Sequence, residues 1–165
     1  KVRVGNKILA IPSTGPHSNG YSLIRKIIKN RRLSRKIINQ LIMPTKIYVK
    51  EIMKLQNKNL INSAAHITGG GLIENLVRSV PTNLSIKIDL AKIKALKIFK
   101  WLKRNNISES EMIRTFNCGI GFCIIVEKKN IKKISIFFSN NFKPYIIGEI
   151  ENKKNKLNLV NKIKW

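Results

Sequence analysis

Residues 13–20 have the sequence STGPHSNG, a run of small polar residues with two glycines that decides the fold of this 165-residue chain. The apolar run Lys7 to Pro12 comes directly before it and predicts a short strand. The run Gly20 to Lys29 comes after it, and its apolar residues recur at helical spacing. In α/β folds, ligands usually bind beside the carboxyl ends of strands, where such loops lie. We therefore expect a binding loop here.

The residues of this loop suit an oxygen-rich ligand. Small hydroxyl side chains, a glycine and the free N–H groups of the following helix form a natural anion site. Ser18 or Asn19 is expected to cap the helix, and a well-capped turn without a ligand remains an alternative. The candidate binding residues are Ser13, Thr14, Gly15, His17, Ser18 and Asn19.

Residues 66–71 have the sequence HITGGG and repeat the order of strand, glycine loop and helix. We predict a strand from Ser63 to Thr68 and a helix that begins at Gly71. Consecutive glycines let backbone N–H groups converge on a ligand without Cβ clashes, although a flexible connector is the alternative. His66 is expected to be a core residue of its strand. The candidate binding residues are Thr68, Gly69, Gly70, Gly71, Glu74 and Asn75.

Residues 114–121 have the sequence RTFNCGIG and lead into the most apolar expected strand, Gly119 to Glu127. Two glycines in a strand suggest that another backbone or a ligand comes close. We favour tight packing, with Asn117 as the residue that reaches the cleft. Cys118 and Cys123 would point to opposite faces of the strand and could not bridge locally. Neither belongs to a Cys-x-x-Cys pair, so no metal site is predicted.

The remaining sequence continues the alternation of strands and helices. Ser108 and Glu111 have the spacing of a capping box at the start of a further helix. We therefore expect one α/β domain over residues 1–165. Further helices are predicted over residues 34–41, 45–55, 93–104 and 130–138, and further strands over residues 84–90, 145–150 and 157–163.

The composition is strongly basic. Lysine and arginine number 33 against 8 aspartates and glutamates, so the formal net charge is +25, a balance typical of nucleic-acid binders. We attribute it instead to a bias toward Lys, Ile and Asn, because the basic residues are spread along the chain. The densest run, Arg31 to Lys36, contains no aromatic residue that could stack on a base. No apolar run has the length of a membrane span, and the cysteine content fits a reducing cytoplasm.

The three glycine-bearing signatures and the link PTKIYVK at residues 44–50 stand in the order found in one enzyme family. They resemble the carboxy-terminal half of the aminoimidazole ribonucleotide synthetases, also called phosphoribosylformylglycinamidine cyclo-ligases. The resemblance extends from Gly5 to about Glu149. It implies an α/β (α+β) sandwich with a mixed sheet flanked by helices. It also implies that an amino-terminal half, which carries most of the ATP site, is missing from this chain. Thr14 departs from a common serine and Asn6 from a frequent aspartate.

The resemblance implies a ring-closing reaction. ATP phosphorylates the formyl oxygen of formylglycinamidine ribonucleotide, and the amidine nitrogen then closes the imidazole ring. The cofactors would be ATP and Mg²⁺, bound mainly through the missing half. Asp89 is the only aspartate, which argues against a complete Mg-ATP site within this chain. His17 would be a catalytic residue, as a polar contact or proton carrier, whereas His66 would matter mainly for folding.

The same resemblance implies the partners: the substrate, the enzyme's own amino-terminal domain, and a second copy bound through that domain. It implies a cytoplasmic enzyme with no membrane contact and no specific nucleic-acid partner. Related ATP-using enzymes share this architecture, including formylglycinamidine ribonucleotide synthetase, selenophosphate synthetase and thiamine monophosphate kinase. The strings HSNGYSL at 17–23 and FNCGIG at 116–121 favour the cyclo-ligase. A non-catalytic binding module and a basic nucleic-acid binder remain alternatives.

Overall fold

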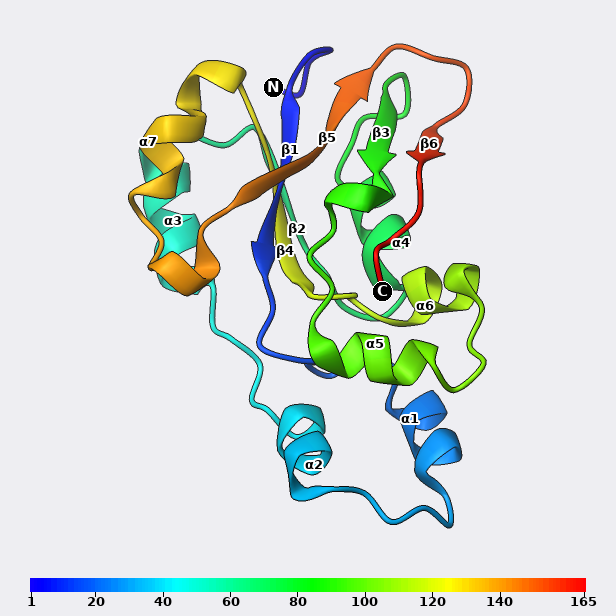
Figure 1. Ribbon diagram of the computed structural model, residues 1–165. Helices are drawn as coiled ribbons and strands as arrows, with labels where there is room; N and C mark the ends of the chain where they lie inside the picture. Colours follow the sequence, from blue (N-terminus) through cyan, green and yellow to red (C-terminus); the bar gives the residue numbers. More distant parts are fainter.

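The computed structural model describes residues 1–165 and centres on one six-stranded sheet (Figure 1). The strand order is β2-β4-β1-β5-β3-β6. Only β3 and β6 pair in parallel, so the sheet is mixed, as predicted. The strands are β1 (Lys7–Pro12), β2 (Ser63–His66), β3 (Ser85–Asp89), β4 (Ile120–Val126), β5 (Tyr145–Glu151) and β6 (Leu157–Val160).

Helices flank both faces of the sheet, which confirms the predicted sandwich. Figure 1 shows α3 and α7 together at one side, while α1, α2, α5 and α6 gather at the other end of the molecule. No helix has the length and apolar character needed to cross a membrane. The α-helices are α1 (Tyr21–Ile28), α2 (Arg35–Leu41), α3 (Val49–Asn57), α4 (Gly71–Arg78), α5 (Lys97–Lys103), α6 (Glu109–Thr115) and α7 (Ile131–Ser135). Short 3-10 turns lie at Leu90–Lys92, Lys128–Asn130 and Asn140–Phe142.

The core is divided by the sheet. In β1, Ile8 and Ala10 belong to a cluster of 27 buried residues that includes side chains of α1, α4, α5 and α6. Leu9 and Ile11 belong to a smaller cluster with Leu55 of α3 and side chains of α7. Successive side chains of a strand point to opposite faces. The continuous apolar sequence of β1 therefore reflects a strand buried on both faces.

Two predicted helices begin four residues later than expected, and the helix predicted over residues 130–138 is confined to Ile131–Ser135. Residues 45–48 are not helical, because Tyr48 is buried and its hydroxyl donates to Pro12 O at 2.8 Å, so α3 begins at Val49. Residues 93–96 cross closely over Gly119, where an added Cβ would lie 2.8 Å from Lys94 O, so α5 begins at Lys97. Strands β2 and β6 also end earlier than predicted, at His66 and Val160.

The predictions for the two cysteines and for the cap of α1 are partly wrong. Cys118 precedes β4 with a positive φ of 50°, and both cysteines lie free in the same core cluster instead of on opposite faces. Helix α1 is capped by Gly20, without a side-chain hydrogen bond from Ser18 or Asn19. Gly20 is left-handed, and a Cβ there would lie 2.2 Å from the Phe116 ring. One half of the predicted capping box forms, because the Ser108 hydroxyl accepts from Glu111 N, whereas the Glu111 carboxylate accepts from Arg114 and Thr115 instead of from Ser108 N.

Candidate functional site

A polar cavity of about 300 Å³ joins the first two glycine-bearing loops. The loop after β1 and the loop after β2 lie side by side because β1 and β2 both pair with β4. The Asn19 amide links the loops directly, since its Nδ2 donates to Ile67 O at 3.2 Å. The residues that line the cavity are His17, Ser18, Asn19, Gly20, Thr45, His66, Ile67, Thr68 and Gly69.

The cavity contains only some of the predicted site residues. His17, Ser18, Asn19, Thr68 and Gly69 line it, as the sequence pattern led us to expect. The other predicted residues do not line the cavity. They are Ser13, Thr14, Gly15, Gly70, Gly71, Glu74, Asn75 and Asn117. Thr45 and His66 were not among the predicted binding residues. Their position in the cavity follows from strand pairing and from the extended segment before α3, which periodicity alone does not reveal.

Asn117 holds the first loop from behind. It is fully buried, with its Nδ2 donating to Gly15 O at 3.0 Å and its Oδ1 accepting from Gly119 N at 2.9 Å. The Ser13 hydroxyl donates to the same Oδ1 at 3.3 Å. A buried amide with these partners fixes the backbone around it. Asn117 therefore positions the loop, whereas the sequence analysis expected it to reach the cleft.

His17 is the only titratable side chain of the first loop, and it is 6% exposed. Its backbone has a positive φ of 57°, which is uncommon for a residue other than glycine. The Thr14 amide donates to His17 Nε2 at 3.2 Å. Burial, helped by the nearby His66, lowers the pKa of His17 to about 4. His17 is therefore neutral at physiological pH.

Close packing constrains two of the three consecutive glycines, Gly70 and Gly71. A Cβ at Gly71 would lie 2.2 Å from Ile113 O of α6. A Cβ at Gly70, whose φ is 89°, would lie 2.2 Å from the Glu74 carboxylate. The half-buried Asn75 bridges the turn, because its Nδ2 lies within hydrogen-bond distance of the carbonyls of residues 68, 69 and 71. The Glu74 carboxylate beside Gly70 is paired with Arg78, whose Nη2 lies 3.1 Å from its Oε2.

Three aromatic side chains pack together next to the cavity. The rings of Tyr48, His66 and Phe122 lie with centroids 5.4 to 6.0 Å apart. The Tyr48 hydroxyl would meet a Cβ at Gly121 at 1.9 Å, so the second strand glycine serves packing, as we favoured. His66 is exposed, which corrects its prediction as a core residue. The expectation came from its apolar neighbours and missed that β2 lies at the sheet edge.

An apolar groove of about 340 Å³ adjoins the polar cavity and shares Thr45 and His66 with it. Ile47, Val49 and Met53 line the groove with exposures of 78%, 65% and 52%. The end of the link before α3 and the first turns of α3 therefore carry a strip of large apolar side chains, exposed to water beside the candidate site. Isolated exposed apolar residues are ordinary, but a contiguous group marks an interaction surface.

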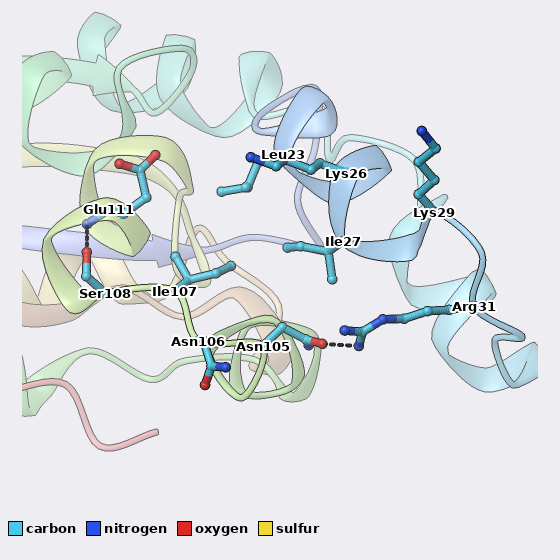
Figure 2. A pocket seen from close by; sticks show the side chains of 10 residues that line it. All are labelled: Leu23, Lys26, Ile27, Lys29, Arg31, Asn105, Asn106, Ile107, Ser108 and Glu111. Carbon is cyan, nitrogen blue, oxygen red and sulfur yellow. Dashed lines mark hydrogen bonds between the residues drawn. The ribbon is translucent and has the colours of Figure 1, made fainter.

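A larger cavity, about 630 Å³, lies elsewhere, between α1 and the turn before α6 (Figure 2). Lys26 and Arg31 line it, and Arg31 is hydrogen-bonded to Asn105. Figure 2 shows the Lys29 side chain directed away from the turn that holds Asn105. None of its lining residues belongs to the glycine-bearing loops, so we place the candidate site at the smaller cavity. The chain has no group of three or more His, Cys, Asp or Glu residues that could hold a metal ion.

A family model for the AIR synthase related protein, C-terminal domain, matches residues 3–159. The chain belongs to this family. Among curated relatives, the phosphoribosylformylglycinamidine cyclo-ligase of Nitrosococcus oceani is 42% identical over 159 residues, which are 91% of this chain and 44% of the relative. That of Fusobacterium nucleatum is 44% identical over 162 residues, which are 92% of this chain and 48% of the relative. The chain thus spans a little under half the length of these relatives.

Solved structures share the fold at low sequence identity. Thiamine-monophosphate kinase from Stenotrophomonas maltophilia has a TM-score of 0.67 at 12% identity, with 99% of this chain and 52% of that chain covered. T. maritima PurL complexed with ADP has a TM-score of 0.61 at 10% identity, with 98% of this chain and 24% of that chain covered. These likenesses support the α/β sandwich of the AIR synthase type.

Proposed function

We propose that this chain is the carboxy-terminal half of a phosphoribosylformylglycinamidine cyclo-ligase, an ATP-dependent enzyme of purine biosynthesis. The observation that carries the proposal is the identity of 42% and 44% to two enzymes of that name, which extends over more than nine-tenths of the chain. The alternative of a related synthetase or kinase rests on structures at 10% and 12% identity. Identity this low supports a shared fold and does not support a shared function.

In this proposal, the polar cavity holds part of formylglycinamidine ribonucleotide. The formyl oxygen attacks the γ-phosphorus of ATP, and ADP leaves. The amidine nitrogen then attacks the formyl carbon, the phosphorylated oxygen leaves as phosphate, and the nitrogen loses a proton. Positioning and charge stabilisation dominate such a reaction. Asn117 and Asn19 keep the first loop in place so that His17 and Ser18 meet the substrate in a fixed geometry.

Magnesium and most ATP contacts would come from outside this chain. Mg²⁺ is bound through carboxylates and phosphates. The residues here do not fit such a site, because no carboxylate lines the polar cavity and Asp89, the only aspartate, lies at the end of β3 with its carboxylate bonded to Asn161. We therefore assign this chain to substrate positioning and not to nucleotide activation.

The partner that completes the cleft would be a unit equivalent to the other half of the relatives. The exposed apolar strip beside the cavity supports this proposal. A unit that covered the strip would lie at the mouth of the polar cavity, because the groove and the cavity share Thr45 and His66. The strip consists of Ile47, Val49 and Met53. Ile47→Asp should weaken association with that unit by at least about tenfold, the effect of a central apolar anchor. Ile136→Asp is the matched control, because Ile136 is equally exposed at 78% and lies after α7.

Reconstitution tests the function. The chain is assayed for ADP formation and ring closure alone, and then together with the amino-terminal half of the Fusobacterium nucleatum relative. We expect no turnover from the chain alone and turnover from the combination. Turnover by the chain alone would show that the ATP site lies within it. A correctly assembled combination without ring closure would contradict the cyclo-ligase assignment.

A further inference from the structure

The carboxyl end of α6 contacts both sides of the polar cavity. Gly20, the cap of α1 that lines the cavity, packs so closely on the Phe116 ring that there is no room for a Cβ. Gly71, the first residue of α4, packs equally closely on the backbone carbonyl of Ile113. Asn117, two residues after the helix, holds the loop after β1. The spacing of the two sides therefore depends on where this end of α6 lies.

The residues that follow α6 are tied to the helix. The Phe116 N–H and the Cys118 thiol both donate to Met112 O, at 2.9 and 3.4 Å. Phe116 and Cys118 are fully buried, and the Phe116 ring lies 5.9 Å from the Phe99 ring of α5. Because this turn is bonded to α6, a displacement of the helix displaces Phe116 and Asn117 with it.

The last five residues of the chain, which we call the tail (residues 161–165), hold the other end of α6. The Ile163 N–H donates to the Glu109 carboxylate in the first turn of the helix at 2.9 Å. The Ile163 side chain is 4% exposed and belongs to the same core cluster as Ile113 and Phe116. Figure 1 shows the tail running from β6 to a position beside α6. Ile163 thus anchors the tail at the helix by its N–H and in the core by its side chain.

The tail is ordered by such anchors and not by secondary structure, since β6 ends at Val160. Terminal residues are poorly ordered unless they are tied down. Asn161 Nδ2 donates to Asp89 Oδ1 at 2.8 Å, and Trp165 packs against the main core cluster. The family model ends at residue 159, so the tail lies outside the matched residues. A role of the tail is therefore not one that the family match supplies.

The first turn of α6 takes its position from the tail. The helix has only seven residues and is about 10 Å long, so it has little stability of its own. Its buried side chains, Met112 and Ile113, lie in the second half. Glu109 bonds to the tail, whereas the other side-chain hydrogen bonds of residues 108–111 stay within residues 108–115. Loss of the tail contact would therefore release the amino end of the helix.

We propose that Ile163 is a positioning residue of the candidate site. It fixes the amino end of α6, and the carboxyl end of the helix then holds the loop after β1 and the start of α4 at the spacing of the polar cavity. Ile163 does not line the cavity and acts through Glu109, Phe116 and Asn117. The inference rests on the proposed function for the expectation that substrate binds in the cavity, whereas the geometry of the loops is tested without it.

Hydrogen exchange of the full chain tests the positioning without reference to activity. Ile163→Asp places a carboxylate at a buried apolar position and releases the tail, and Lys162→Asp adds the same group at the exposed neighbour as a control. The reporters are the bonded amides of Ser13 and Gly71, and the reference is the Ile150 amide, which is bonded to the segment before β1.

We expect Ile163→Asp to speed exchange at Ser13 and Gly71 by at least about tenfold relative to Ile150, because a buried anchor is lost. Lys162→Asp should leave these relative rates unchanged. Relative rates that stay within about twofold of the unchanged protein in Ile163→Asp would overturn the proposal. An equal increase in Lys162→Asp would also overturn it.

A second control separates positioning from a general loss of stability. Leu55 of α3 is fully buried in the smaller core cluster, on the other face of the sheet from α6. Leu55→Ala therefore destabilises the fold from that face. We expect it to change the exchange of Ser13 and Ile150 in parallel. A selective increase at Ser13 as large as that in Ile163→Asp would overturn the proposal.

A matched pair at Glu109 tests whether Ile163 acts through α6. Glu109→Gln keeps an oxygen that accepts from the Ile163 N–H, whereas Glu109→Ala removes it, and both remove the charge from the first turn. We expect Glu109→Ala to speed exchange at Ser13 about two- to tenfold, the factor that one hydrogen bond contributes. Glu109→Gln should remain close to the unchanged protein. Equal exchange rates in the two variants would overturn the proposal.

Kinetics of the reconstituted enzyme connect the geometry to binding. A loss of stability alone lowers the amount of active enzyme and leaves KM unchanged, whereas a displaced cavity wall raises KM. We expect Ile163→Asp to raise the KM for formylglycinamidine ribonucleotide about tenfold and Ile163→Val to retain the original value. A lower maximal rate at unchanged KM would overturn the proposal. If the unchanged combination closes no ring, the cyclo-ligase assignment fails, while the exchange measurements still decide the role of Ile163.

Discussion

The two loops that meet in the polar cavity share the order strand, glycine loop and helix, but they are held in different ways. Buried side chains hold the loop after β1. Asn117 and Asn19 are 0% and 5% exposed, and their amides donate to the backbone carbonyls of Gly15 and Ile67. The loop after β2 is held by the half-buried Asn75, and the N–H groups of Gly69 and Gly70 have no partner. The first loop is therefore a preformed binding element, and the second can adjust to what binds beside it.

Removal of the buried Asn117 side chain should have the largest effect on this difference between the two loops. Asn117→Ala leaves Gly15 O and Gly119 N without their partners and a cavity at a fully buried site. We expect a loss of about 3 kcal/mol in the free energy of unfolding, measured by denaturant titration. Asn75→Ala, the corresponding change in the other loop, should cost about 1 kcal/mol or less. Equal losses would remove the distinction between the loops.

The pH dependence of stability comes next in size. His17 has a pKa of about 4 in the folded protein and an ordinary value of 6.5. Because the folded pKa is lowered, the unfolded chain binds more protons between these values. Stability is complete above pH 6.5 and falls as the pH decreases toward 4, by at most about 1.4 kcal/mol per pH unit. His17→Asn should flatten this slope in denaturant titrations at several pH values. An unchanged slope would assign it to other groups, such as the partly exposed His66.

The glycine loop should show a smaller, strictly local effect. Gly70→Ala places a Cβ against the Glu74 carboxylate in a left-handed backbone and should cost about 1–2 kcal/mol. Part of this cost should disappear when Glu74→Ala is added, as a double-mutant cycle would show. Gly69→Ala is the control, because nothing lies within 4 Å of a Cβ there and its φ is not positive. A Gly69→Ala cost as large as that of Gly70→Ala would contradict the described geometry.

The sequence predicts the fold and marks the loops after β1 and β2 as candidate binding loops, but it does not predict the contacts within them. The strand from Lys7 to Pro12 was predicted with its observed bounds, because a short apolar run ends there at a polar loop. Asn117 was expected at the cleft, since nothing in its local sequence shows that Gly15, more than a hundred residues earlier, lies beside it. His66 was expected in the core, because an edge strand is recognised only once the order of the strands is known. Local patterns determine elements, whereas side-chain partners depend on the pairing of distant strands.

Backbone hydrogen exchange tests the contrast between the loops most directly. Three amides of the first loop are bonded: Ser13 N to Gly119 O, Thr14 N to His17 Nε2, and Asn19 N to Pro16 O. The account predicts slow exchange for these amides, and exchange near the rate of an unstructured peptide for Gly69 and Gly70. Exchange of these three amides as fast as that of Gly69 and Gly70 would contradict the conclusion that the loop after β1 is the preformed part of the site.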